Sequence, residues 1–210
     1  MFDLTRAIAY STPDSRQSLE DLYRSQSVIS IKRGQFIPME QGKIYIVNRG
    51  LVQLHTLYVS GDERILGLAH PSMPFGLPLT QVVPYEAIAL SDVLLVRLDE
   101  EEIDESPQLA QRLFREVTRR LQQTEVLLMI AGERRIEARL RLLLKLLSQE
   151  IGEDTEQGIR LNVRLTHQQI SGMIGTTRVT ITRTLLEFKK AGFLDVDATR
   201  HLLISRTSDI

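Results

Sequence analysis

The stretch from Leu165 to Leu194 constrains the fold more than any other part of the chain. Thr166 and Gln169 form the capping-box pair that begins a helix, in which a hydroxyl and an amide satisfy free backbone N–H groups. Gly175 supplies a sharp turn, because glycine takes a positive φ without penalty, and either of the two threonines after it can cap a second helix. Two short helices joined at a glycine are typical of a helix-turn-helix, and an ordinary two-helix core segment is the alternative.

The second of these helices is expected to read DNA. Its apolar residues recur at helical spacing, whereas Arg178, Thr182 and Arg183 fall largely on another side. A helix buried in a core has no need of an arginine on the turn after its cap, so the pattern favours a recognition helix in the DNA major groove. The residues expected on the buried side are Ile181, Leu185 and Phe188.

The distribution of charge agrees with contact to nucleic acid at the C-terminal end only. The chain of 210 residues carries a net charge of −1. Between Arg160 and Arg206 there are eight Lys or Arg residues and three acids, which gives +5 there and leaves −6 for the remainder. A basic end on an acidic body is the pattern expected when one domain binds phosphate.

Composition excludes several classes of protein. The chain contains no cysteine, which excludes disulfides, zinc–thiolate sites and cysteine-ligated iron–sulfur clusters. The sequence has no apolar run long enough to cross a membrane, so no membrane partner is expected. The first ten residues, MFDLTRAIAY, lack the basic flank and apolar stretch of a signal peptide, and a cytoplasmic protein is therefore expected.

Catalytic and metal-binding patterns are also missing from the sequence. The four histidines, at positions 55, 70, 167 and 201, do not have metal-ligand spacing. A jelly-roll metalloenzyme would need clustered His and Glu on facing strands, and no pair of nucleophile and base is evident. We therefore predict no metal, no cofactor and no enzymatic activity.

Between Ser27 and Val96 the chain has the pattern of short β-strands. Alternating or β-branched runs are separated by glycines, and such strands with regular turns predict a sandwich or jelly roll. Residues 19–23 suggest a short helix before it, and four prolines make the segment from His70 to Tyr85 irregular, as in a binding loop or a plain connection. The expected strands are 28–31, 44–47, 51–57, 65–68, 87–90 and 93–97.

A long helix is predicted after the acidic run from Asp99 to Glu105, which is itself expected to form a solvated turn. Ser106 and Pro107 suit the N-cap and the first helical residue. The helix has two apolar faces, which need two partners. One is expected to cover the β-domain, and the other to pair with the same helix of a second chain; a helix wrapped inside one monomer is the alternative. The dimer seam comprises Ala110, Phe114, Val117, Leu121, Thr124, Leu128 and Ala131, and the second face Leu113, Leu127 and Ile130.

The remaining segments predict a hinge, a helix and a hairpin. Gly132 to Arg134 interrupts the long helix and is the predicted hinge. Ile136 to Ile151 has the pattern of an amphipathic helix that packs under the helix-turn-helix. Gly152 to Gly158 is expected to be a polar loop. Val196 and Leu202 to Ile204 flank a turn, as in a small hairpin or wing.

The order of these parts resembles the Crp/Fnr superfamily of transcription regulators over nearly the whole chain. The β-roll pattern appears as IKRGQFI, IYIVNRGLVQL and Phe75-Gly76, and the dimer-helix pattern as RRLQQTE at 119–125. The most specific run, TTRVTITR at 176–183, is most similar to the global nitrogen regulators of that superfamily. The resemblance implies an α+β fold with three parts. These are a β-roll (1–105), which is a cyclic-nucleotide-binding-like jelly roll, a long dimerisation helix with its hinge (106–134), and a C-terminal winged helix-turn-helix (135–210).

The resemblance also implies DNA contacts, residue by residue. Arg178 and Arg183 match base-reading arginines, whose paired N–H groups can donate to O6 and N7 of guanine. Val179 stands where some members carry a glutamate that accepts from cytosine, and a valine offers only apolar contact, for example to a thymine methyl group. The residues at phosphate-contacting positions are Thr166, His167, Gln168, Thr177 and Thr182.

The cyclic-AMP site of the superfamily is not matched. Members that bind cyclic AMP hold its ribose and phosphate with a Gly-Glu pair and an Arg-Ser/Thr pair. Here Gly76 is followed by Leu77, and the region of the second pair holds Glu86, whose carboxylate would repel a phosphate. We therefore predict no useful affinity for cyclic AMP.

The 2-oxoglutarate site of the nitrogen regulators is matched in part. Phe75, Gly76, Arg120 and Glu125 match it, whereas Val83 stands where the arginine of the roll is expected. Arg120 could pair with a carboxylate of the effector, and a salt bridge with a nearby acid is the alternative. The expected effector site comprises Phe75, Gly76, Leu77, Arg120, Thr124 and Glu125.

These observations predict a dimeric, sequence-specific DNA-binding transcription regulator that reads a palindromic operator and does not depend on cyclic AMP. Its expected partners are double-stranded DNA, a second copy of the chain and RNA polymerase. Two alternatives stay open: a regulator that responds to 2-oxoglutarate, and a β-roll ligand-sensing module that acts through a protein partner. The sequence does not decide whether a small-molecule effector exists.

Overall fold

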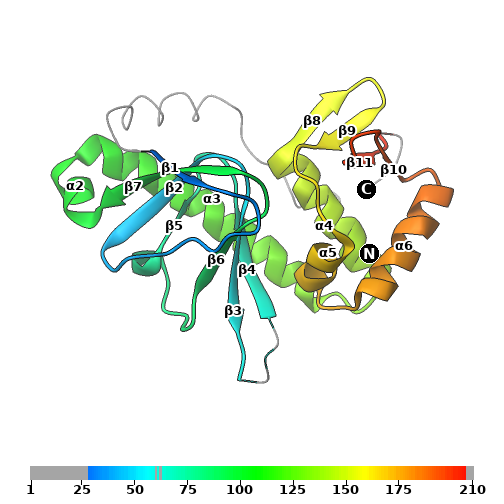
Figure 1. Ribbon diagram of the computed structural model, residues 1–210, viewed down its shortest axis with the longest axis horizontal. Helices are drawn as coiled ribbons and strands as arrows, with labels where there is room; N and C mark the ends of the chain where they lie inside the picture. Colours follow the sequence, from blue (N-terminus) through cyan, green and yellow to red (C-terminus); the bar gives the residue numbers. More distant parts are fainter. Residues whose placement is uncertain (1–27, 60, 62, 207–210) are drawn as a thin grey trace. The chain divides into compact units, whose positions relative to one another are not determined.

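The computed structural model describes residues 28–59, 61 and 63–206, so the short helix expected at 19–23 lies outside the described residues (Figure 1). The chain divides after Glu125 into two compact units. Among the described residues, no helix has the length and apolar character needed to span a membrane.

The first unit contains two antiparallel sheets, with strand orders β1-β7-β2-β5 and β4-β3-β6 (Figure 1). All six predicted strands are present, and the segment with four prolines adds a short strand, β5, which pairs Phe75 with Tyr45 of β2. The same segment continues into a 3-10 helix, η2 (Leu77–Leu79). The strands are β1 (Val28–Ile31), β2 (Lys43–Arg49), β3 (Val52–Leu57), β4 (Glu63–Ala69), β5 (Pro74–Phe75), β6 (Glu86–Ala89) and β7 (Val93–Asp99).

The core of this unit lies between the two sheets. Alternate residues of each strand point inward, so both sheets contribute buried side chains to one cluster. The rings of Tyr45 and Phe75 stack within it, with centroids 5.6 Å apart. This arrangement confirms the predicted jelly roll. The cluster includes Tyr45, Val47, Phe75, Val93 and Leu95 from one sheet and Val52, Leu54, Ala69, Ala87 and Ala89 from the other.

The acidic run after β7 is a helix and not the predicted turn. Helix α2 (Glu100–Glu105) begins after Asp99, whose backbone N–H donates to the Glu102 carboxylate over 2.9 Å. Acidic side chains in the first turn favour a helix, because they lie at its positive end. The prediction was wrong because it treated the charges as serving only the next helix.

Helix α3 (Pro107–Gly132) starts directly after Ser106, as predicted. Its first turns cover the outer face of the β1-β7-β2-β5 sheet, where Leu109 and Leu113 pack against Ile44, Ile46, Val96 and Leu98. Of the face predicted to cover the β-domain, Leu113 does so, together with Leu109, which was not predicted.

The second unit contains helices α4 (Ile136–Ile151), α5 (His167–Ile174) and α6 (Arg178–Lys190) and a four-stranded sheet of order β10-β11-β9-β8. The predicted C-terminal hairpin is confirmed as β10 (Leu194–Val196) and β11 (Leu202–Ile204). The prediction of a polar loop at 152–158 was wrong, because this segment contributes to a hairpin of β8 (Gly152–Thr155) and β9 (Gly158–Leu161). Its strands are short and β8 is largely polar, so no apolar alternation marked it.

Helix α4 supports the helix-turn-helix, as predicted. It starts at Ile136, after the predicted break in the long helix, and it packs against α5 and β9. The Arg139 guanidinium donates to the carbonyl oxygen of Ile174, the last residue of α5, over 2.6 Å. The leucines of α4 that are fully buried in the unit are Leu140, Leu143, Leu144, Leu146 and Leu147.

Candidate nucleic-acid interface and effector site

The start and end of α5 have the predicted chemistry. The Thr166 hydroxyl accepts from the backbone N–H of Gln169 over 3.1 Å, and the Gln169 side chain accepts from the backbone N–H of Thr166 over 2.8 Å. Gly175 ends the helix with φ 67° and ψ 55°, in the left-handed region that favours glycine. These contacts fix the tight turn between α5 and α6.

Helix α6 is capped at both ends by its own sequence. Thr177, one of the two threonines expected to serve, is the N-cap, and its hydroxyl accepts from the backbone N–H of Thr180 over 3.2 Å. At the other end Gly192 takes φ 72°, and the N–H of Phe193 donates to the carbonyl oxygen of Phe188 over 2.9 Å. The recognition helix is therefore a defined segment from Arg178 to Lys190.

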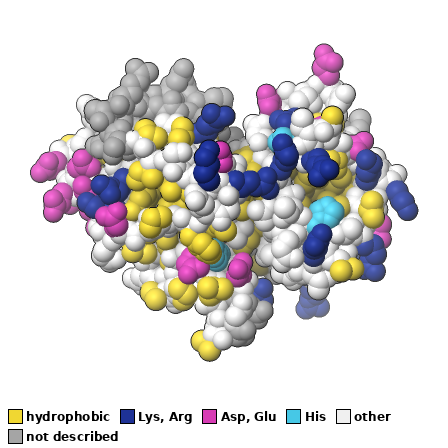
Figure 2. Space-filling model, viewed as in Figure 1, with side chains coloured by type: hydrophobic (Ala, Val, Ile, Leu, Met, Phe, Trp, Pro, Cys, Tyr) yellow, Lys and Arg dark blue, Asp and Glu magenta, His cyan; other side chains and the backbone are white. Residues whose placement is uncertain are grey.

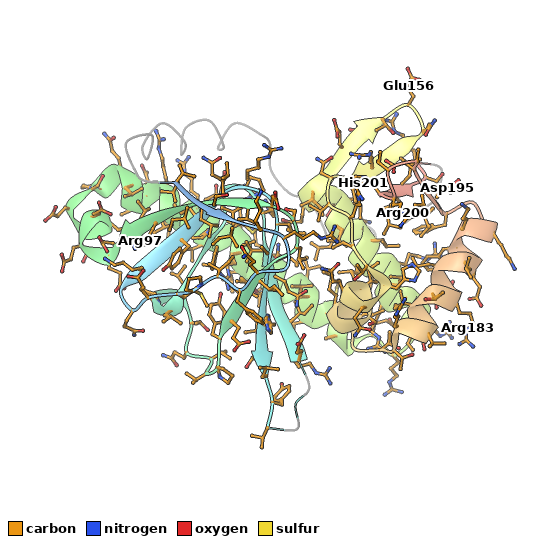
Figure 3. The ribbon with its side chains drawn as sticks, in the orientation of Figure 1. Arg97, Glu156, Arg183, Asp195, Arg200 and His201 are labelled. Atoms are coloured by element: carbon orange, nitrogen blue, oxygen red, sulfur yellow. The ribbon has the colours of Figure 1, made fainter. Side chains whose placement is uncertain are left out.

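The two sides of α6 differ as the sequence predicts. Ile181, Leu185 and Phe188 are buried. Arg178 and Arg183 are exposed, and Figure 3 shows Arg183 on the outside of the helix. Neither arginine side chain has a hydrogen-bond or ion-pair partner among the residues that the structure describes.

The outer side of α6 therefore offers free donors for an external acceptor. Val179, the third predicted base-reading residue, has 79% of its surface exposed on the same side. Figure 2 shows Lys and Arg side chains spread over the visible face of this unit, which suits contact with phosphates.

The residues predicted to contact phosphate lie at the starts of α5 and α6. The structure joins two of them, since His167 Nδ1 lies 2.8 Å from Thr182 Oγ1. The Thr182 hydroxyl donates to the carbonyl oxygen of Arg178 over 2.9 Å, so Nδ1 of His167 must carry the proton that it shares with Thr182.

The other three residues predicted to contact phosphate also lie at the starts of these helices, Thr166 and Gln168 at α5 and Thr177 at α6. The Thr166 and Thr177 hydroxyls accept from backbone N–H groups as caps, and the Gln168 side chain is exposed. All five residues remain predicted phosphate contacts, because the structure contains no nucleic acid.

A network at the tip of the C-terminal hairpin was missed by the sequence reasoning. Arg160 of β9 donates to the Asp197 carboxylate over 2.7 Å, and its other nitrogen lies 2.7 Å from Nδ1 of His201. The Arg160 guanidinium holds the pKa of Asp197 well below its usual range, and burial lowers the pKa of His201. Asp197 at the start of the turn was the available signal, but its arginine partner lies on a strand that was not predicted.

The Phe75-Gly76 loop of the predicted effector site is shaped by backbone packing. The Phe75 ring is fully buried in the roll. Gly76 has φ 147°, and a Cβ atom there would lie 2.6 Å from the carbonyl oxygen of Lys43. Leu77 begins η2 directly after it. The glycine is therefore required by its neighbours in the roll, whether or not a ligand binds.

Arg120 has partners that its sequence context did not predict. Its guanidinium donates to the carbonyl oxygen of Pro74 over 2.9 Å and to the hydroxyl of Tyr85 over 2.8 Å. Tyr85 is buried in the core of the roll, and this burial raises the pKa of its phenol. The Pro74 carbonyl oxygen and the Tyr85 hydroxyl are both uncharged, which differs from the salt bridge with a nearby acid that was the alternative role for Arg120. Tyr85 is the residue of this site that the sequence did not reveal.

The structure brings together only part of the predicted effector site. Arg120 reaches the strand that carries Phe75, but the side chains of Thr124 and Glu125 are exposed. The Thr124 hydroxyl donates to the carbonyl oxygen of Arg120 over 2.9 Å. Glu86, which was expected to repel the phosphate of cyclic AMP, lies 3.2 Å from Nε2 of the buried His55.

The predicted dimer seam is exposed along α3. Phe114, Leu121 and Leu128 have 70%, 59% and 73% of their surfaces exposed. Thr124 and Ala131 are exposed as well. Val117 is partly buried, because it packs against the cluster beneath α3. A row of large apolar side chains is thus left open on the side of α3 that the heptad spacing marks.

Comparison with known proteins agrees with this geometry. Residues 138–208 match the family model of the Crp-like helix-turn-helix domain. The chain is 35% identical over 165 residues to the regulatory protein CysR of Synechococcus elongatus, covering 77% of this chain and 76% of that protein. It is 29% identical over 164 residues to the global nitrogen regulator of Synechocystis sp., covering 73% and 72% of the two chains.

Solved structures share the fold over most of the chain. FixK2 from Bradyrhizobium japonicum gives a TM-score of 0.72 at 18% identity, over 85% of this chain and 92% of that one. TTHA1359 from Thermus thermophilus, described as a transcriptional regulator of the CRP/FNR family, gives 0.68 at 25% identity, over 85% and 94%.

Proposed function

The chain belongs to the Crp/Fnr family of DNA-binding transcription regulators. From that premise we propose that it acts as a dimer. The dimer binds a palindromic operator and does so without a small-molecule effector. The observation that carries this proposal is the contrast between the free guanidinium groups of Arg178 and Arg183 and the engaged group of Arg120. Donors are available on α6, while those of Arg120 on α3 already contact Pro74 and Tyr85.

The exposed face of α3 supports the dimer. Phe114, Leu121 and Leu128 follow one another at intervals of seven residues, which is the repeat of a coiled-coil seam. An apolar row of this kind is costly in water and is buried when a second copy of the helix packs against it. A two-fold axis along α3 would hold the two recognition helices of the dimer about 34 Å apart, so that each could enter one of two successive major grooves.

The contacts of Tyr85 support independence from an effector. Its hydroxyl accepts from Arg120 over 2.8 Å, and this bond joins the roll to α3. An anionic effector at Arg120 would have to displace the Tyr85 hydroxyl or the Pro74 carbonyl oxygen. Cyclic AMP would also meet Glu86 in place of a cation.

A regulator that responds to 2-oxoglutarate is the second candidate. Arg120 lies within hydrogen-bond distance of the strand that carries the Phe75-Gly76 loop, as such a site requires. Displacement of the neutral phenol by a carboxylate would give Arg120 a stronger, charge-assisted partner.

The wider setting belongs to the same proposal. We place the regulator in the cytoplasm, with RNA polymerase as its protein partner and no enzymatic activity of its own. In this proposal residues 1–105 act as the sensor-like domain, 106–134 as the dimerisation helix and hinge, and 135–210 as the DNA-binding domain. The contacts of the five predicted phosphate-binding residues set its register on DNA.

The deciding experiment measures assembly, DNA binding and ligand binding of the purified full chain. Operators are selected from a random DNA pool, and calorimetry follows titration with cyclic AMP and with 2-oxoglutarate. We expect a palindromic consensus, binding by the ligand-free protein, and no heat with either compound. Selection of DNA only when 2-oxoglutarate is present would favour the second candidate, and micromolar binding of cyclic AMP would overturn both.

Sedimentation tests the dimer with a matched pair of variants. Leu121→Asp places a charge in the seam, while Gln122→Asp places the same charge on the neighbouring exposed residue outside it. We expect the first to be a monomer with lost operator binding and the second to stay a dimer. Intact dimers of Leu121→Asp would remove the seam from the proposal.

A further inference from the structure

We propose that Leu186 is a further sequence-reading residue, which together with Val179 recognises the 5-methyl groups of two thymines in the operator. The inference rests on the proposed function, because it requires that α6 enters the major groove. It adds a position that the resemblance does not assign to DNA contact.

The first observation is the exposure of Leu186. It has 56% of its surface exposed, although Leu185 beside it and Phe188 in the next turn are buried in the unit. Single exposed leucines are common on protein surfaces and need no explanation by themselves. Leu186 differs from such leucines because it lies on the recognition helix, on which a second apolar residue, Val179, is also exposed.

The second observation is the helical phase of the two residues. Seven residues separate them, which is about two turns, so their side chains leave α6 in directions that differ by only about 20°. The same spacing places them about 10.5 Å apart along the axis, at a rise of about 1.5 Å per residue. For α6 lying along the DNA axis, with about 3.4 Å between base pairs, Val179 and Leu186 would lie over positions about three base pairs apart, which is the largest separation that this spacing allows.

The third observation is the chemistry between and beside them. Thr182 lies between the two along the helix, and its hydroxyl already donates to the carbonyl oxygen of Arg178 and contacts Nδ1 of His167. Arg183, with its free guanidinium, flanks the same strip. The middle of the outer face therefore offers apolar contact, and the charged donors lie at its edges.

Only one feature of the major-groove edges matches an apolar strip. Guanine, adenine and cytosine present hydrogen-bonding atoms there, whereas thymine adds a 5-methyl group. A leucine or valine against guanine or cytosine would leave polar atoms without partners. Apolar contact with thymine methyl groups is therefore the readout that these side chains favour.

The size of each contact can be stated as a change in affinity. Burial of one methyl group changes a dissociation constant about fourfold. We therefore expect two thymines in each half-site, about three base pairs apart, whose 5-methyl groups each contribute about that factor.

Deoxyuridine provides the probe, because it lacks the 5-methyl group and keeps every hydrogen bond of thymine. Each thymine of the selected operator is replaced in turn, and dissociation constants are measured for the unaltered protein, Leu186→Ala and Val179→Ala. The unaltered protein should lose about fourfold at two thymines per half-site. Leu186→Ala should lose its sensitivity at one of them only, and Val179→Ala at the other.

Two controls keep the outcome specific. Glu187→Ala truncates the next exposed residue of α6 and should keep the sensitivity of the unaltered protein at both thymines. Replacing the thymine under Leu186 by 5-methylcytosine should restore part of the affinity that an unmethylated cytosine loses. Circular dichroism and thermal unfolding confirm that each variant is folded.

The failures of the two proposals are distinguishable. Absence of any sequence-specific DNA binding would overturn the proposed function, and this inference with it. Tight operator binding with no loss at any deoxyuridine, or equal losses for Leu186→Ala and the unaltered protein at every thymine, would overturn this inference alone. A selected operator without thymines at the required separation would do the same.

Discussion

Arg120 of α3 and the two arginines of the recognition helix differ in what their guanidinium groups touch. Arg120 donates to the Pro74 carbonyl oxygen and to the Tyr85 hydroxyl, so the roll satisfies it internally. Arg178 and Arg183 are exposed on α6, and the described residues provide no partner for either side chain. An engaged arginine contributes to folding, because removing its partner leaves a donor unsatisfied, whereas a free one keeps its donors for an external acceptor.

Arg160 shows that its contacts, and not the unit in which it lies, decide whether an arginine is engaged or free. It lies in the same unit as the recognition helix, yet it donates to Asp197 and to His201. By its contacts it belongs with Arg120. The comparison therefore predicts that substitutions at engaged sites change the free energy of unfolding, and that substitutions at free sites change the free energy of DNA binding.

The largest effect is expected at the glycine of the roll. Gly76→Ala would place a Cβ atom 2.6 Å from the Lys43 carbonyl oxygen at φ 147°, so the free energy of unfolding of the roll should fall by about 2–4 kcal/mol. Gly67→Ala is the control in the same unit, because its Cβ would meet atoms at 3.5 Å or beyond. Urea unfolding measures both. Equal stability of the two variants would mean that the loop can move, and that the roll is less closed than its contacts indicate.

Arg178→Ala is expected to separate binding from folding. It should weaken operator binding by about 1–3 kcal/mol, because the paired donors to guanine are lost. The free energy of unfolding should stay within about 0.5 kcal/mol, as for other exposed substitutions. Fluorescence anisotropy on operator and random DNA measures the first quantity and urea unfolding the second. A loss of stability as large as the loss of binding would contradict the distinction between free and engaged arginines.

Tyr85→Phe is expected to show the opposite pattern. The change removes an acceptor from Arg120 and keeps the ring in the core, so the free energy of unfolding should fall by about 1–2 kcal/mol. Operator affinity of the ligand-free protein should stay the same, because the DNA-binding helix is untouched. If the variant instead gained affinity for 2-oxoglutarate and lost operator binding without it, the roll site would be a sensor that the phenol keeps closed.

Much of the fold could be predicted because its signals are local. The caps at Thr166 and Thr177 and the glycine at 175 act within a few residues, so sequence and structure agree there. The seam of α3 and the buried side of α6 follow from helical periodicity alone. The two arginines of α6 were found for the same reason, since their place relative to a cap is readable from the chain.

The contacts that were missed join residues far apart in the sequence. Tyr85 and Arg120 are 35 positions apart, and Arg160 and Asp197 are 37 apart. Each pair depends on how a strand lies against another element, which periodicity does not specify. The β8–β9 hairpin was missed as well, and without it Arg160 had no predicted place beside the turn. Whether an arginine is engaged or free is therefore a property that only the folded chain reveals.

The smallest effect is expected from acid on the network around Arg160, and it tests whether this arginine is engaged. An arginine can only donate, so its contact with Nδ1 of His201, 2.7 Å away, favours the neutral ring, in which that nitrogen accepts. Burial and the Arg160 charge lower the pKa of His201, against the opposing effect of Asp197. The His201 ring of the unfolded chain then takes up a proton at higher pH than that of the folded chain. The stabilisation that the neutral ring gives the folded chain is therefore complete above the ordinary pKa of 6.5 and is lost as the pH falls below it.

His201→Gln keeps an acceptor near Arg160 and does not titrate. Thermal unfolding from pH 8 to 5.5 should therefore show a decline for the unaltered protein, about 1–2 °C of which is absent in His201→Gln. Identical pH profiles for the two proteins would show that His201 is not held neutral beside Arg160, whose engagement would then rest on its bond to Asp197.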